Sequence, residues 1–285
     1  MSTVVIGRFS PCLNSYLTAL RAASTLIITA AEAARSARLP WTAAEREAMI
    51  RAALGEAADR LTFVHADDHP YGDVADPVCE TRDDEEAVCA AFFAGDDATV
   101  AAAVPPGVFN LMQVFRDGPE YGRLADEARY IANYKKQWAS SPFPPVFITV
   151  DAVITCAGHV LLIQRGGQPG RGLWATPGGF LEVAERIQTS AIRELREETG
   201  LSLSDDEAKA ALKASRVFDD PRRSAIGRVV THGFHFELSG NLPAVTASDD
   251  ARAARWWPLA ELDQLHGRMH DDHFHILDWF LKGTT

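Results

Sequence analysis

The sequence predicts a protein of two α/β domains, and three observations lead to this prediction. The chain has 285 residues, more than the roughly 100–200 residues of one typical domain. Residues 139–145 contain three prolines, which can continue neither a helix nor a central strand. Apolar runs alternate with helical segments before this stretch, whereas a strand hairpin and a long helix follow it. We expect domains at 1–138 and 146–285, joined by a linker at 139–145.

The first domain is expected to hold a parallel sheet with helices on its faces. Short apolar runs predict strands at Val4–Ile6, Leu26–Ile28 and Leu61–Val64. Helices are expected at 16–23, 42–54 and 121–138, and the second of them opens with the capping box Thr42–Glu45. Strands of this kind that alternate with helices are typical of parallel sheets covered on both sides.

The second domain is expected to have a mixed α/β fold. Two strand-like runs, 146–154 and 159–165, flank a hairpin at 155–158. Further strands are predicted at 214–218 and 228–238, another apolar run ends at Trp256–Trp257, and a last helix is expected at 274–281. Between them, Gly178–Gly179 and Gly200 bound a segment that predicts a helix of about four turns.

The overall composition argues against several function classes. The formal net charge is −11, which disfavours a nucleic-acid partner because phosphate backbones bind basic surfaces. No stretch approaches the ~20 apolar residues of a membrane span, and the N-terminus lacks the pattern of a signal peptide. The four cysteines, Cys12, Cys79, Cys89 and Cys156, are scattered. We therefore expect reduced thiols and a cytoplasmic location, with no membrane partner.

The helical segment before Gly200 carries the clearest chemical signal. On a helical wheel Glu194 and Glu198 fall at the margin of the apolar face, and Glu197 lies further round. Like charges four residues apart destabilise a helix unless something neutralises them. Clustered carboxylates beside a core are costly without a cation, and such oxygen ligands suit Mg²⁺ or Mn²⁺. Arg193 can reach Glu197 and hold a carboxylate in place.

The full pattern resembles the Nudix box at every fixed position. It reads Gly179, five residues, Glu185, seven residues, Arg193-Glu194-Leu195-Arg196-Glu197-Glu198-Thr199-Gly200-Leu201. The resemblance implies an α/β/α sandwich and hydrolysis of a nucleoside diphosphate linked to another group. It also implies that Glu194, Glu197, Glu198 and the Gly178 carbonyl bind the metal, and that Glu185 and Arg193 orient this cluster. The general base is left open between Glu185 and an acid in the loops 249–250 or 261–272.

Segments around the box resemble one two-domain family, the bifunctional nicotinamide mononucleotide adenylyltransferase/Nudix ADP-ribose pyrophosphatases. These segments are 143–153, 169–174, 217–224, 227–228, 249–251, 257–259 and 272–276. The resemblance implies hydrolysis of ADP-ribose, a small-molecule nucleotide substrate, to AMP and ribose 5-phosphate, and commonly a homodimer. Phe218, Arg223 and Arg228 are the expected substrate contacts, by base stacking and phosphate binding. The histidines of 266–275 are expected to cap the last helix rather than to act in catalysis.

The first domain resembles the Rossmann-like nucleotidyltransferase half of that family, but its motif is broken. Gly7-Arg8-Phe9-Ser10-Pro11 is present, whereas Leu13, Ser15 and Tyr16 stand where the family has His, Gly and His. Leu and Tyr cannot supply the imidazoles that stabilise charge on ATP phosphates. We therefore expect a degenerate adenylyltransferase domain that has lost adenylyl transfer.

Three alternatives are kept open. The Nudix half could act on another nucleoside diphosphate derivative, such as NADH or a sugar nucleotide. The chain could retain nicotinamide mononucleotide adenylyltransferase activity and be bifunctional. It could also be a non-enzymatic sensor of ADP-ribose, although a sensor needs no intact metal cluster.

Overall fold

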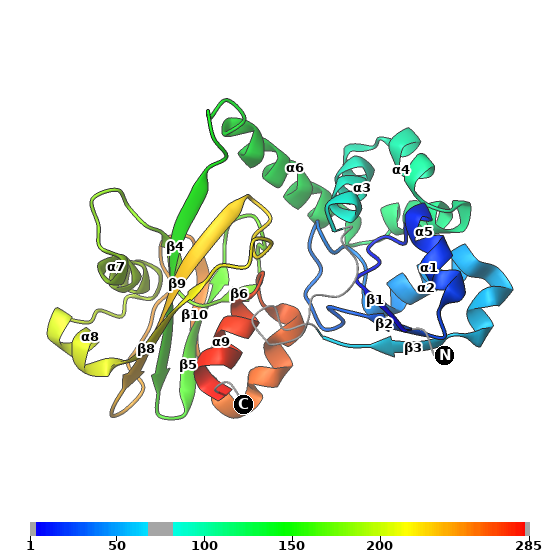
Figure 1. The fold of residues 1–285 in the computed structure, drawn as a ribbon. Helices are drawn as coiled ribbons and strands as arrows, with labels where there is room; N and C mark the ends of the chain where they lie inside the picture. The colour runs from blue at the N-terminus through cyan, green and yellow to red at the C-terminus, as the bar shows by residue number, and fades with distance from the viewer. Residues whose placement is uncertain (1–3, 68–81, 283–285) are drawn as a thin grey trace. The chain divides into compact units, whose positions relative to one another are not determined.

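The computed structural model describes residues 4–67 and 82–282, so Cys79 lies outside the described residues. The chain forms two compact units, Met1–Ala132 and Asn133–Thr285 (Figure 1). The division falls inside a helix that precedes the proline-rich stretch. The boundaries 1–138, 139–145 and 146–285 therefore stay a prediction. Cys12, Cys89 and Cys156 are buried free thiols.

The first unit contains the expected parallel sheet, with helices around it. Strands β1 (Val4–Gly7), β2 (Thr25–Ile28) and β3 (Thr62–His65) pair in that order and are all parallel. The helices are α1 (Leu17–Ala22), α2 (Ala43–Leu54), α3 (Arg82–Ala94), α4 (Asp97–Ala103), α5 (Pro106–Arg116) and α6 (Tyr121–Gln137), with 3-10 turns at Asn14–Tyr16 and Gly55–Arg60. The capping box of Thr42 and Glu45 opens α2 as predicted.

The second unit is built on a mixed seven-stranded sheet. Its strands are β4 (Val146–Cys156), β5 (His159–Arg165), β6 (Trp174–Ala175), β7 (Gly178–Phe180), β8 (Leu212–Phe218), β9 (Arg228–Leu238) and β10 (Ala251–Pro258). They run in the order β10-β5-β4-β9-β8, with β6 on β5 and β7 on β4. β4 and β9 are parallel, and the other pairs are antiparallel.

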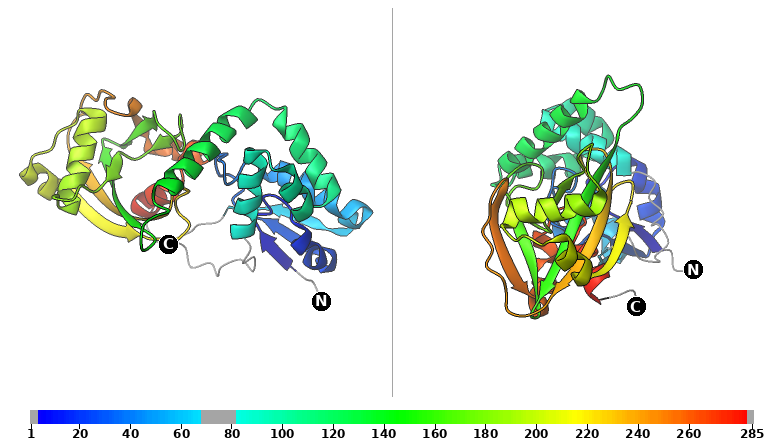
Figure 2. Two further views of the ribbon diagram at one scale, coloured as in Figure 1. Left: turned by 90° about the horizontal axis from the view of Figure 1, so that it is seen from above. Right: turned by 90° about the vertical axis from the view of Figure 1, so that its left-hand side faces the viewer.

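Helices cover both faces of this sheet. On one face, α7 (Ile187–Thr199) buries Ala191 and Leu195 against alternate residues of β4, and α8 (Asp205–Ala211) lies beside it. On the other face, α9 (His273–Lys282) packs Phe280 against Phe218, and a 3-10 segment (Leu259–Arg268) precedes it. Figures 1 and 2 show α7 and α9 on opposite sides of the strands. The predicted α/β/α sandwich is confirmed.

The observed helix α7 is shorter than the segment between the glycines that were expected to bound it. Gly178 and Gly179 lie in strand β7, which pairs with β4, and α7 begins only at Ile187. Gly200 ends the helix in the left-handed conformation, with φ of 69°, which glycine adopts without strain. None of the described helices combines the length and apolarity that a membrane span requires.

Candidate active site

Helix α7 presents three glutamates with graded exposure. The Glu198 residue is 3% exposed, the Glu194 side chain 12% and the Glu197 side chain 37%. This order follows from the helical wheel, because Glu198 lies nearest to the face that Leu195 and Ala191 bury in the core, and Glu197 lies furthest from it. The three carboxylates therefore lie along the edge between the core and the surface.

Arg193 is the centre of the cluster. Its Nε donates to Glu185 Oε1 at 3.0 Å, and its Nη1 donates to Glu194 at 2.9 Å and to Glu197 at 2.8 Å. Its Nη2 also donates to the carbonyl of Phe180 at 3.2 Å, which ties α7 to strand β7. These bonds raise the pKa of Arg193 and lower the pKa of Glu185. Arg193 thus holds three carboxylates in fixed positions, and Glu185 stays ionised.

Glu198 is the most buried of these acids. Its Oε2 accepts a hydrogen bond from the N–H of Gly178 at 2.8 Å. The pKa of Glu198 is raised to about 9, mainly by burial and in smaller part by the nearby acids Asp250 and Glu194, while the hydrogen bond from the Gly178 N–H opposes the shift. Burial likewise raises the pKa of Glu194. A carboxylate in this position needs a cation to remain ionised at neutral pH.

The loop before β10 adds two more acids to the same place. Asp250 acts on the pKa of Glu198, and Asp249 acts on that of Glu194. The loop is fixed to the end of α7 because the N–H of Ser248 donates to the carbonyl of Glu198 at 3.2 Å and its hydroxyl donates to the carbonyl of Glu197. One of the two loops considered for the general base is therefore at the cluster.

The two glycines of β7 allow the close approach of this cluster. A Cβ on Gly179 would lie 2.5 Å from Oε1 of Glu194. A Cβ on Gly178 would overlap the carbonyl of Val150 and lie 3.0 Å from the Asp151 carboxylate. A side chain at Gly178 would therefore displace the backbone of β4, and one at Gly179 would displace the carboxylate of Glu194.

A small cavity of about 110 Å³ begins at these glycines. Its lining includes Arg165, Arg223, His270 and His273, together with Gly178–Phe180. Gly178 belongs to both the cavity wall and the glutamate cluster, and Arg165 lowers the pKa of both Glu198 and His270. The cavity and the cluster therefore adjoin.

A buried polar network forms one end of the cavity. The carboxylate of Asp151 accepts from Thr176 at 2.7 Å and from Thr231 at 2.6 Å. His273 Nδ1 lies 2.8 Å from the Thr176 hydroxyl, and burial lowers the pKa of this histidine. These residues come from strands and loops far apart in the sequence, so spacing alone gave no signal for Asp151, Thr176 or Thr231.

The three predicted substrate contacts occupy different environments. Arg223 lines the cavity, where its Nε and Nη2 donate to Asp272 at 3.0 and 2.9 Å. Arg228 donates to the carbonyls of Asp219 and Asp220 and shapes their loop. Phe218 is fully buried, with its ring 5.7 Å from that of Phe280. The structure thus brings only Arg223 of the three to the cavity.

The predicted ligand Gly178 and the late histidines are also placed. The N–H of Gly178 contacts the cluster, and the role of its carbonyl as a metal ligand stays a prediction. His273 is the first residue of α9 and His270 lies just before the helix, yet both line the cavity. Burial lowers the pKa of both, which favours neutral imidazoles.

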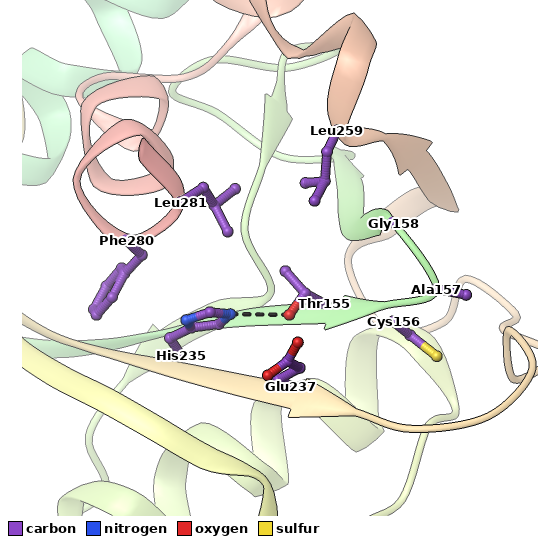
Figure 3. Close-up of a pocket in the computed structure, with 9 residues that line it drawn as sticks. All are labelled: Thr155, Cys156, Ala157, Gly158, His235, Glu237, Leu259, Phe280 and Leu281. Atoms are coloured by element: carbon purple, nitrogen blue, oxygen red, sulfur yellow. Dashed lines mark hydrogen bonds between the residues drawn. The ribbon is translucent and has the colours of Figure 1, made fainter. Parts of the chain in front are cut away.

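A larger cavity of about 290 Å³ lies at the hairpin between β4 and β5 (Figure 3). Its lining includes Thr155, His235 and Phe280, and His235 Nε2 lies 2.9 Å from the Thr155 hydroxyl. None of the described residues that line it belongs to the predicted site. The candidate site therefore adjoins the smaller of these two cavities.

In the first unit, the two residues that replace the histidines of the broken motif are buried. Leu13 and Tyr16, which replace the expected histidines, are 4% and 6% exposed. The Tyr16 hydroxyl donates to Glu85 at 2.7 Å, and its ring packs edge-on against Phe9. Burial raises the pKa of Glu85, which Arg8 opposes. Phe9, Leu13 and Tyr16 belong to the hydrophobic core of the unit.

Sequence comparisons match the second unit. The NUDIX domain model matches residues 146–280. An ADP-ribose pyrophosphatase of Methanocaldococcus jannaschii is 34% identical over 118 residues, which is 41% of this chain and 65% of that protein. An uncharacterized Nudix hydrolase of Bacillus subtilis, YvcI, is 41% identical over 136 residues, which is 47% of this chain and 78% of that protein. The match thus spans just under two thirds of the first relative and more of the second.

A solved structure matches nearly the whole chain. It is a bifunctional NMN adenylyltransferase/ADP ribose pyrophosphatase of Francisella tularensis, complexed with AMP and a manganese ion. The TM-score is 0.86 at 27% identity, over 98% of each chain. The similarity therefore includes both units.

Proposed function

Because the chain belongs to the Nudix family, we propose that its second unit hydrolyses the pyrophosphate of ADP-ribose to AMP and ribose 5-phosphate. The observation that carries this proposal is the cluster of Glu185, Glu194 and Glu197 around Arg193, with the buried Glu198 against Gly178. The choice of substrate is supported by relatives named as ADP-ribose pyrophosphatases, one of them similar over nearly the whole chain.

The donor set fits a divalent cation, and we propose Mg²⁺ or Mn²⁺. Glu194, Glu197 and Glu198, with the carbonyl of Gly178, would hold it. Carboxylate and carbonyl oxygens are the ligands that these hard ions prefer. The raised pKa of Glu198 supports a bound cation, because a buried acid beside Asp250 is stable as an anion only next to positive charge. An ion held there would supply positive charge against the charge that develops on the pyrophosphate and would lower the pKa of a water molecule.

The remaining residues of the cluster position these ligands. Arg193 holds Glu194 and Glu197 on one side and bonds the Phe180 carbonyl on the other, so α7 and β7 keep a fixed spacing. We propose that Glu185 orients Arg193 rather than accepting a proton, because its pKa is lowered by that arginine. Asp249 and Asp250 are then the candidates for the general base.

Of the predicted substrate contacts, we propose that Arg223 meets the substrate. Its guanidinium lines the cavity beside Gly178, and Asp272 fixes its orientation through two bonds. Phe218 and Arg228 support the fold, as a core ring and as the brace of the 219–220 loop.

For the first unit we propose an adenylyltransferase-like fold without adenylyl transfer. The buried Leu13 and Tyr16 replace the two imidazoles that the reaction requires. The similarity of both units to the Francisella enzyme favours the bifunctional alternative, which an assay of dinucleotide formation from nicotinamide mononucleotide and ATP would test. A homodimer remains a proposal that sedimentation velocity would test.

The experiment for the proposed function is a substrate panel with Mg²⁺. ADP-ribose, NADH and a sugar nucleotide are incubated separately with the full chain, and the products are separated by ion-exchange chromatography. We expect AMP and ribose 5-phosphate in equal amounts from ADP-ribose, at the highest kcat/KM of the panel. Turnover of NADH or the sugar nucleotide alone would show that ADP-ribose is not the substrate. No turnover of any of the three compounds would refute the proposal that the chain is a hydrolase.

A further inference from the structure

The cavity beside Gly178 has an apolar aromatic end and a charged end. On one face of β4, Phe147, Thr149 and Asp151 follow each other at every second position, with ~7 Å between neighbours. Strand β7 pairs with them so that Phe180 lies opposite Thr149 and Gly178 opposite Asp151. The aromatic rings therefore gather at the Phe180 end, and the Asp151 network lies at the Gly178 end.

Phe180 exposes its ring at the aromatic end. The residue is 45% exposed, although exposed phenyl surface is costly in water. Among the described residues that line the cavity, it supplies the one phenyl ring. Val229 and Ile226, which also line the cavity, add apolar surface to its wall. This end of the cavity therefore suits a flat, apolar group.

The ring of Phe180 is held in place from behind. It packs against Phe147 with centroids 5.9 Å apart at an interplanar angle of 76°, and Phe147 packs against Trp138 at 5.2 Å and 67°. Edge-to-face contacts of this kind fix the orientation of a ring. A ring that is oriented before binding loses little side-chain entropy when a ligand covers it.

The position of the ring relative to the glutamates matches the layout of a nucleotide. Phe180 is two residues, or ~7 Å, from Gly178 along β7. Gly178 and Gly179 contact Glu198 and Glu194, where a pyrophosphate would meet the metal. A base on Phe180 would therefore be separated from that pyrophosphate by about the span of one ribose.

From this geometry we propose that Phe180 is the residue on which the adenine base of the substrate stacks. The inference rests on the proposed function, and it assigns to Phe180 the role that the sequence had suggested for the buried Phe218. The AMP half of the substrate then lies toward Phe180. The remaining sugar phosphate extends toward Arg223 and His270.

The binding of each product, measured separately, tests the aromatic end and the charged end of the cavity independently. Titration calorimetry with Mg²⁺ gives the Kd of AMP and of ribose 5-phosphate for the wild type and for Phe180→Ala, Phe180→Leu and Phe180→Tyr. Loss of one stacking partner weakens base binding by roughly tenfold or more. We expect Phe180→Ala to weaken AMP binding by this factor and Phe180→Leu to weaken it less. Phe180→Tyr should bind AMP as the wild type does. Ribose 5-phosphate is expected to bind all variants within about twofold, because it has no base.

Phe143→Ala is the matched control, because Phe143 is 78% exposed and is not among the residues that line the cavity. It is expected to leave both Kd values unchanged. Unchanged AMP binding in Phe180→Ala, an equal loss for ribose 5-phosphate, or conversion of a wild-type dimer to a monomer would each overturn the inference. Failure of the wild type to hydrolyse ADP-ribose refutes the proposed function instead, and is scored separately by product formation.

Discussion

Removal of Arg193 is expected to destabilise the second unit through three carboxylates at once. Breaking a buried ion pair costs about 3–5 kcal/mol, whereas exposed pairs are worth only about 0–1 kcal/mol. The side chains of Arg193, Glu185 and Glu194 are 12–16% exposed, and that of Glu197 is 37% exposed. For Arg193→Gln we therefore expect a loss of about 2–3 kcal/mol in the free energy of unfolding without metal.

Two further variants separate charge from geometry. Arg193→Lys keeps the charge but lacks the planar fork that bonds several oxygens, so about half of the loss should remain. Arg196→Gln is the matched control on the same helix. Its side chain is 58% exposed and 3.9 Å from Glu197, and it should cost less than about 0.5 kcal/mol.

The assay is urea unfolding in EDTA, followed by tryptophan fluorescence. Five of the six tryptophans, all but Trp41, belong to the second unit, so the signal reports mainly that unit. Equal losses for Arg193→Gln and Arg196→Gln would show that Arg193 does not organise the cluster, and the reasoning would be refuted.

Three other outcomes are expected. Gly179→Ala should weaken Mn²⁺ binding, measured by electron paramagnetic resonance, by roughly 10–100-fold, because the new Cβ would lie 2.5 Å from Glu194; unchanged affinity would contradict this. In EDTA the folded chain holds a proton on Glu198, with a pKa of about 9, that the unfolded chain releases near pH ~4.3. This group therefore lowers the free energy of unfolding as pH rises between these values. The stability advantage of Glu198→Gln over the wild type should grow from about pH 6 to about pH 8, and an advantage that stayed constant would show that the glutamate is already ionised. Finally, nicotinamide mononucleotide and ATP should give no dinucleotide by chromatography, and any dinucleotide that depends on the enzyme would establish the bifunctional alternative.

The glutamate cluster was predictable because its geometry is local. Arg193, Glu194 and Glu197 lie within two turns of one helix, so the period of 3.6 residues fixes their mutual positions. The edge position of Glu198 follows from the same rule. The contact with Gly178 needed the pairing of β7 with β4, which a helical wheel does not contain.

The proposed substrate end of the site could not be predicted in this way. Phe218 and Phe180 both follow apolar or glycine-rich segments, and nothing local shows which ring is buried. In the structure, α9 covers Phe218, whereas Phe180 remains exposed beside the cavity. Likewise Asp151, Thr176 and His273 meet only because β4, the segment before β7 and α9 converge.

The most direct test of the metal site is the rate of ADP-ribose hydrolysis by Glu198→Gln with saturating Mg²⁺. The matched control is Glu182→Gln, an exposed glutamate in the loop before α7. We predict that Glu198→Gln lowers kcat by roughly 10²-fold or more, because an amide cannot supply the buried anionic ligand. Glu182→Gln should retain the wild-type kcat. Near wild-type kcat in Glu198→Gln would show that the active site lies elsewhere.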